Sequence, residues 1–189
     1  MAPAEGAGRP PPVPRPRLRK RDLPRDDLGR LRAPGEPDAM AHLKRAQQDP
    51  PELARTRELA RHSLAERRFF EAVTYCDLIR KHPATPPGRQ PVWRALAQVA
   101  AGLCHLQRGN AAGALAVLDR GVDGLAAHRE AAWPGLEALE RTVTGLLAEL
   151  HAADADDAAP DPPPIDLVLD PEGGAGSGSA GGFGEEPGP

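Results

Sequence analysis

Histidine is the residue type best suited to proton transfer, because imidazole titrates near neutral pH. Among the six histidines of this sequence, His105 is the best candidate. At helical spacing it shares one side of a predicted helix with Arg94 and Gln98. These three side chains form a polar stripe on an otherwise apolar helix, which makes them candidate binding residues. A histidine that is simply hydrogen-bonded at a helix interface has the same pattern, and we prefer that structural interpretation of His105.

Two acids, Asp77 and Glu71, are the carboxylates that could act with His105 in acid–base chemistry. Asp77 could pair with His105 or with Arg108, and Arg108 is a fourth candidate binding residue. For Asp77 we prefer an ordinary ion pair or hydrogen bond. Glu71 lies in the first turn of a predicted helix, where the helix dipole favours an acid, so a structural role is preferred there as well.

A predicted turn follows the helix that carries His105. Gly109 can adopt the left-handed conformation that ends a helix, and Asn110 can cap the next helix. Gly113 permits a close approach between helices. We therefore predict structural roles in this turn for Gly109, Asn110 and Gly113.

The spacing of the apolar residues predicts an all-α bundle of about five helices. The expected helices begin at about residue 50, cover 69–81, begin at Pro91, cover 111–127 and begin near Pro134, with a further short helix conceivable at 38–48. Asp49 is expected to cap the helix that begins near residue 50, with Pro50 in its first turn. Segments 50–81 and 92–127 predict two helical hairpins, similar to those of helical-hairpin repeat proteins.

Composition divides the chain into three parts. Residues 1–37 are rich in Pro and Arg and lack an apolar period, so we expect a disordered tail. Residues 38–151 form the helical domain. Residues 152–189 are acidic and rich in Pro, Gly and Ser, and we expect a second disordered tail.

The two tails carry opposite charge. Residues 1–34 hold nine basic and four acidic residues, a net charge of +5, whereas nine acids and no Lys or Arg follow residue 151. Such tails attract each other weakly, and salt screens the attraction. One apolar piece of the acidic tail is expected to lie back on the helical body as an extended strip: Ile165, Leu167, Val168 and Leu169.

Part of the chain resembles a known family. The run from Leu96 to Leu103, followed by His105, Arg108-Gly109-Asn110 and Gly113-Ala114, is similar to the H-x-x-R-G-N-x-x-G-A signature of the bacterial family called domain of unknown function 309. Trp93-Arg94 and the segment Pro24-Arg25-Asp26-Asp27-Leu28-Gly29-Arg30-Leu31 also look like parts of that family's pattern. The resemblance covers about residues 23–150 and implies a small helical domain.

The family's earlier F-x-A-H-E-x-x-E-x-x-W motif is altered in this chain. Phe70, Glu71 and Ala72 match well. The family's His, Glu, later Glu and Trp positions hold Val73, Thr74, Asp77 and Arg80. In the family, the His and Glu residues could form a cluster that binds a metal or performs acid–base work. The resemblance therefore implies that this chain, which keeps His105 and an Asp, has lost or rebuilt such a site.

These observations favour a helical module that binds a protein or peptide between helices, rather than an enzyme. A metal-dependent or acid–base enzyme that uses His105, Asp77 and Glu71 is the alternative. Nucleic-acid contact through the basic N-terminal tail is a weaker alternative, since no aromatic residues alternate with its arginines. We predict no cofactor and no metal, and a homodimer is left open.

The two cysteines, Cys76 and Cys104, lie in apolar helical stretches, which predicts buried free thiols. No apolar run approaches the roughly 20 residues of a membrane span, and the N-terminus lacks the apolar segment of a signal peptide. We therefore expect a cytoplasmic protein with no membrane contact.

Overall fold

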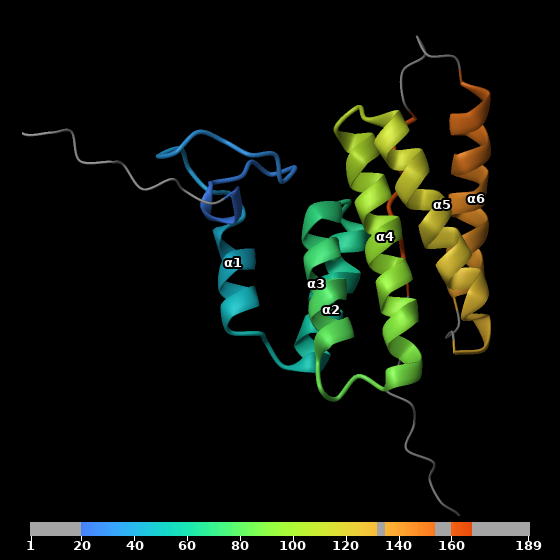
Figure 1. Cartoon of the computed structure of the whole chain (residues 1–189), viewed down its shortest axis with the longest axis horizontal. Coiled ribbons are helices and arrows are strands. Elements are labelled where there is room, and N and C mark those ends of the chain that lie inside the picture. Colours follow the sequence, from blue (N-terminus) through green and yellow to red (C-terminus); the bar gives the residue numbers. More distant parts are fainter. Residues whose placement is uncertain (1–19, 132–134, 154–159, 168–189) are drawn as a thin grey trace, which may run out of the picture.

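A computed structural model describes residues 20–131, 135–153 and 160–167 of this chain. These residues contain six α-helices and three short 3-10 helices, which pack as an all-α bundle (Figure 1). The α-helices are α1 (Ala41–Gln48), α2 (Leu53–Ala65), α3 (Phe69–Lys81), α4 (Gln90–Gln107), α5 (Ala111–Ala127) and α6 (Leu136–Ala152). The all-α bundle predicted from the apolar spacing is confirmed, with α1 as its sixth helix.

Helix α4 is the centre of the bundle. It packs against α3 on one side and against α5 on the other, and α6 covers α5 (Figure 1). Trp93, Leu96, Val99 and Leu103 on α4 are at most 1% exposed. Because apolar side chains cover most of its circumference, α4 can be buried on several sides at once. The hairpins α2–α3 and α4–α5 correspond to the two predicted hairpins.

The start of α2 differs from the prediction. Asp49 is the residue that ends α1, where its backbone N–H donates to the carbonyl oxygen of Arg45, and it does not cap α2. Helix α2 begins only at Leu53, after Glu52. The reason is local, because Pro51 disfavours the helical conformation at the residue before it, so no helix can start at Pro50.

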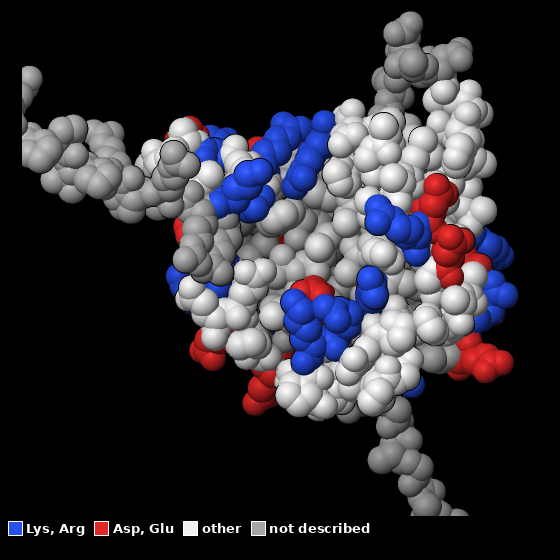
Figure 2. Space-filling view, in the orientation of Figure 1, with Lys and Arg blue, Asp and Glu red and all other residues white. Residues whose placement is uncertain are grey.

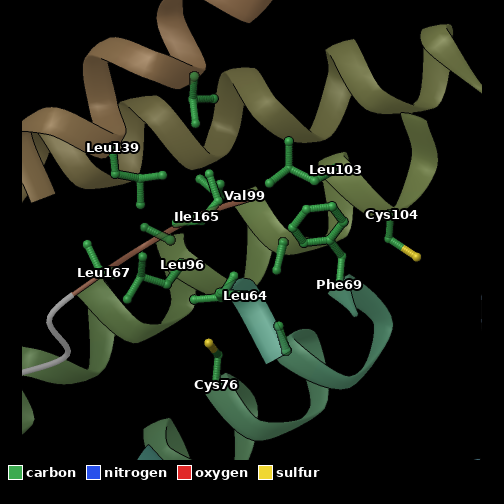
Figure 3. Packing of buried hydrophobic residues seen from close by; sticks show 14 of the residues in the cluster. Leu64, Phe69, Cys76, Leu96, Val99, Leu103, Cys104, Leu139, Ile165 and Leu167 are labelled. Carbon is green, nitrogen blue, oxygen red and sulfur yellow. The ribbon is translucent and has the colours of Figure 1, made fainter. Parts of the chain in front are cut away.

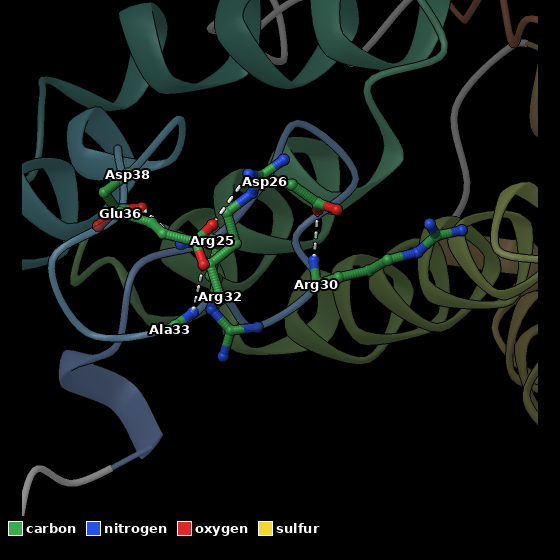
Figure 4. Close-up of polar contacts among 7 residues, drawn as sticks. All are labelled: Arg25, Asp26, Arg30, Arg32, Ala33, Glu36 and Asp38. Atoms are coloured by element: carbon green, nitrogen blue, oxygen red, sulfur yellow. Dashed lines mark hydrogen bonds and ion pairs between the residues drawn. The ribbon is translucent and has the colours of Figure 1, made fainter.

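Residues 24–32 form a compact loop at the start of the described chain, here called the N-terminal clasp. The backbone amide of Arg30 donates to the carboxylate of Asp26 at 2.7 Å (Figure 4). The backbone amide of Arg32 donates to the carbonyl oxygen of Pro24 at 2.9 Å. Gly29 takes a positive φ of 74°, which a residue with a side chain would rarely adopt. The expectation of a disordered tail over 1–37 is therefore wrong for residues 20–37, and residues 1–19 lie outside the described part.

Residues 160–167 lie on the bundle in an extended conformation and are here called the C-terminal strap. Ile165 and Leu167 are 5% and 1% exposed, and the backbone amide of Ile165 donates to the carbonyl oxygen of Leu64 at 3.2 Å. Figure 3 shows both side chains among apolar residues of the bundle, including Leu96 and Leu139. The predicted apolar strip is confirmed for Ile165 and Leu167. The expectation of disorder over 152–189 is wrong for the strap.

Some predicted positions fall outside the described residues. They are Pro134, Val168 and Leu169. Within the described part of the chain, none of the helices has the length and apolar character that crossing a membrane requires.

Candidate functional site

A shallow groove of about 490 Å³ runs between α3 and α4. Seven residues line this α3–α4 groove: Val73, Asp77, Arg80, Arg94, Ala97, Gln98 and Ala101. The α3 residues and the α4 residues each recur at spacings of three and four, which places each set on one helical face. The short side chains of Ala97 and Ala101 leave the space between the helices open.

The groove carries a net positive charge. The Asp77 carboxylate accepts hydrogen bonds from Arg80, at 3.0 Å from Nε and 2.6 Å from Nη2, and it also pairs with Lys81. Burial acts to raise the pKa of Asp77, but the hydrogen bonds from Lys81 and Arg80 outweigh it and hold that pKa below its ordinary value. Asp77 is therefore ionised at neutral pH. Among the seven lining residues, Asp77, Arg80 and Arg94 leave a net charge of +1, and Lys81 pairs with Asp77 from outside this lining.

Two polar side chains of the groove are available to a ligand. Arg94 is exposed and Gln98 is half-buried, and neither has a hydrogen bond or ion pair with any residue that the structure describes. In the space-filling view, Lys and Arg side chains gather over the ends of α3 and α4 on this face (Figure 2). Both residues were predicted as binding candidates, and the structure places them in one groove with Asp77.

His105 lies outside this groove. Its Nδ1 atom is 3.1 Å from Nδ2 of Asn110, in the turn that leads to α5. Asn110 caps α5 as predicted, because its Oδ1 atom accepts a hydrogen bond from the backbone amide of Gly113 at 2.8 Å. A Cβ atom at Gly113 would lie 2.6 Å from Nδ2 of Asn110 and 2.8 Å from Nδ1 of His105. Gly109 has a φ of 71°, as expected for a residue that ends a helix.

Arg108 holds the N-terminal clasp against the bundle. Its Nε and Nη2 atoms donate to the carbonyl oxygen of Leu28 at 3.0 and 2.5 Å. The guanidinium carbons of Arg25 and Arg108 lie 5.1 and 5.6 Å from the centroid of the Phe70 ring. Gly29 packs directly on that ring, since a Cβ atom there would lie 2.3 Å from its Cγ. Arg108 therefore has a structural contact in this fold, which the spacing within α4 could not reveal.

Glu71 is a buried carboxylate between α1, α2 and α3. Its Oε2 atom is 3.4 Å from Nη1 of Arg68 and 3.5 Å from Nε2 of His42, and the hydroxyl of Ser63 donates to it at 3.5 Å. The sequence did not single out His42 or Ser63, because neither has a helical spacing that relates it to Glu71. Glu71 thus joins three helices by polar contacts that are individually long.

The predicted acid–base set is not brought together. Asp77 pairs with Arg80 and Lys81 rather than with His105 or Arg108, and Glu71 has a separate set of partners. Nowhere in the described ranges do three His, Cys, Asp or Glu residues lie where they could hold a metal ion.

Both cysteines are buried free thiols, as predicted. Burial raises the pKa of Cys76 to about 12, and burial also raises the pKa of Cys104. Both thiols are therefore protonated at neutral pH, which makes them poor nucleophiles.

Comparison with known proteins finds no matching family model, no matching curated protein and no matching solved structure. The resemblance to domain of unknown function 309 stays a prediction. The structure does bring three segments of that resemblance into contact, because the clasp, Phe70 and Arg108 meet at one place.

Proposed function

We propose that the α3–α4 groove binds a short acidic peptide segment of a partner protein. Two observations carry this proposal: the lining of the groove has a net charge of +1, and its side chains Arg94 and Gln98 have no polar partner among the described residues. A peptide with carboxylates would supply the missing partners.

Each part of the groove has a role toward such a ligand. The planar guanidinium of Arg94 can receive a carboxylate through two parallel hydrogen bonds. The carboxamide of Gln98 can both donate to and accept from a peptide backbone. Val73, Ala97 and Ala101 offer apolar surface to one small or medium apolar side chain of the peptide. The expected ligand therefore combines at least one apolar residue with two or more acids.

The groove suits a peptide better than a nucleic acid. No aromatic side chain is among its seven lining residues, so the groove has no surface on which a base could stack.

Fluorescence anisotropy with two labelled probes tests this function. The first probe is the peptide Gly-Leu-Val-Asp-Leu-Glu-Asp-Gly, and the second has Lys at each acidic position. We expect the full chain to bind only the acidic probe. Arg94→Glu should weaken that binding about tenfold, or ~1.4 kcal/mol, because it removes an attractive pair and adds a repulsive one. Arg55→Glu is the matched control, since Arg55 is exposed on α2 and outside the groove.

Three outcomes would overturn the proposal. They are equal binding of both probes, equal losses in Arg94→Glu and Arg55→Glu, and displacement of the probe by a single-stranded RNA oligonucleotide whose own binding requires Arg94. The last outcome would assign the groove to nucleic acid.

A further inference from the structure

The C-terminal strap ends on the same end of the bundle as the cations of the α3–α4 groove. A Cδ1 atom of Leu167, the last described residue, lies 3.6 Å from the Cβ position of Gly135, the residue that precedes α6. Figure 1 shows that α6 begins at the end of the bundle where α3 ends and α4 begins. Arg80 and Lys81 are in the last turn of α3, and Arg94 is in the first turns of α4.

The residues that follow Leu167 have the chemistry of the expected ligand. Val168 and Leu169 are apolar, and Asp170 and Glu172 are acidic. A Gly- and Ser-rich stretch leads from there to two further acids, Glu185 and Glu186, and no Lys or Arg occurs in this part of the chain. Residues 168–189 thus offer an apolar pair and four carboxylates.

The groove is within reach of this segment. Extended chain covers about 3.3 Å per residue, so Asp170 can lie roughly 10 Å and Glu172 roughly 17 Å from Leu167. A helix with its side chains is about 10 Å across, and Arg94 is only about 6 Å along the axis from the start of α4. A chain that leaves Leu167 and passes the first turn of α4 can therefore reach Arg94.

We propose, resting on the proposed function, that residues 168–189 occupy the α3–α4 groove of the same molecule and compete with the partner's acidic peptide. A tethered segment acts at an effective concentration in the millimolar range, so weak individual contacts suffice for competition. The acidic tail is then an internal regulator of peptide binding. The carboxylates of the tail supply the negative charge for this competition.

The test uses the full chain with its tail charges neutralised. The variant Asp170→Asn, Glu172→Gln, Glu185→Gln, Glu186→Gln should bind the acidic probe about fivefold more tightly than the wild type, because the internal competitor is weakened. The control is Asp154→Asn, Asp156→Asn, Asp157→Asn. These acids follow the far end of α6, a helix about 25 Å long, which exceeds the Debye length of about 8 Å at 0.15 M salt. The control should leave the affinity unchanged.

The outcomes separate this inference from the proposed function. If Arg94→Glu abolishes probe binding but neutralising the tail brings no gain, the groove binds acidic peptides and the tail does not compete. An equal gain in the control variant would show a general charge effect and would also overturn the inference. A gain that grows with protein concentration would place the tail in the groove of a second copy and overturn binding within one molecule. Loss of all probe binding, even with the tail neutralised, would instead overturn the proposed function.

Discussion

The carboxylate of Asp77 lowers the positive charge of the α3–α4 groove. It accepts hydrogen bonds from Arg80 and Lys81, which hold its pKa below the ordinary value of 3.8 against the opposing effect of burial. A lowered pKa in the folded state means that the ionised form stabilises the fold above the unfolded-state pKa. This contribution is lost as the pH falls through the lowered pKa of Asp77.

Asp77→Asn should raise the affinity of the acidic probe about threefold at pH 7, because it frees Arg80 and Lys81 for the ligand. Anisotropy titrations at low and high salt measure this gain, and the gain should shrink at high salt. Asp119→Asn is the control, since Asp119 is exposed on α5 and outside the groove. Weaker binding by Asp77→Asn would show that this carboxylate itself contacts the ligand.

His105 and Asn110 provide a second prediction at this scale. Asn110→Ala should lower the free energy of unfolding by about 1 kcal/mol, because the cap of α5 is lost. His105→Ala should cost less and should leave the affinity for the acidic probe unchanged, because its ring contacts Asn110 at the end of α4 and lies outside the groove. Urea denaturation measures the first effect and anisotropy the second. Loss of probe binding in a folded His105→Ala protein would contradict this placement of the groove.

At the scale of elements, two glycines determine how closely α4 and α5 approach. A Cβ atom at Gly102 would lie 2.4 Å from Cγ of Leu118 and 3.3 Å from the Leu118 backbone nitrogen. A Cβ atom at Gly121 would lie 3.1 Å from the backbone nitrogen of Val99. The two helices therefore touch at backbone distance, and α4 stays at the centre of the bundle because small residues let its neighbour approach.

Gly102→Ala should lower the free energy of unfolding by about 2 kcal/mol, because the added methyl group forces α4 and α5 apart. The control is Gly145→Ala on α6, where a Cβ atom would meet open space. The control should be neutral or more stable by up to about 1 kcal/mol, since alanine favours helix over glycine. Thermal and urea unfolding measure both variants, and similar losses in the two would refute the close contact.

At the scale of the whole molecule, segments from both ends of the described chain complete the bundle. The N-terminal clasp is held on Phe70 between Arg25 and Arg108. The C-terminal strap places Ile165 and Leu167 in the core, and Arg67 pairs with Asp161 where the strap begins. The folded unit is therefore larger than the helices alone, and its apolar core is completed by a segment that is not helical.

Leu167→Ala should lower the free energy of unfolding by about 3 kcal/mol, because it leaves a cavity among buried side chains. The matched control is the neighbouring Asp166→Asn, at an exposed position of the same strap, which should change stability by no more than about 0.5 kcal/mol. Urea denaturation of the full chain measures both. Wild-type stability of Leu167→Ala would mean that the strap does not complete the core.

The sequence by itself determined the all-α class, and the predicted bounds 69–81 and 111–127 coincide with α3 and α5. It also determined the cap at Asn110 and the apolar character of the strap. These features depend on residues within one or two helical turns, where apolar spacing, proline and glycine act directly on the backbone.

Only the tertiary structure decided which polar side chains meet. Arg108 binds the carbonyl oxygen of Leu28, 80 positions earlier, and Arg67 pairs with Asp161, 94 positions later. Periodicity within one helix places Asp77 and His105 on helical faces, but it does not show that Asp77 lines a groove while His105 contacts Asn110 in the turn after α4. Such contacts depend on how whole helices pack, and helix packing follows from the summed burial of many side chains rather than from any local motif.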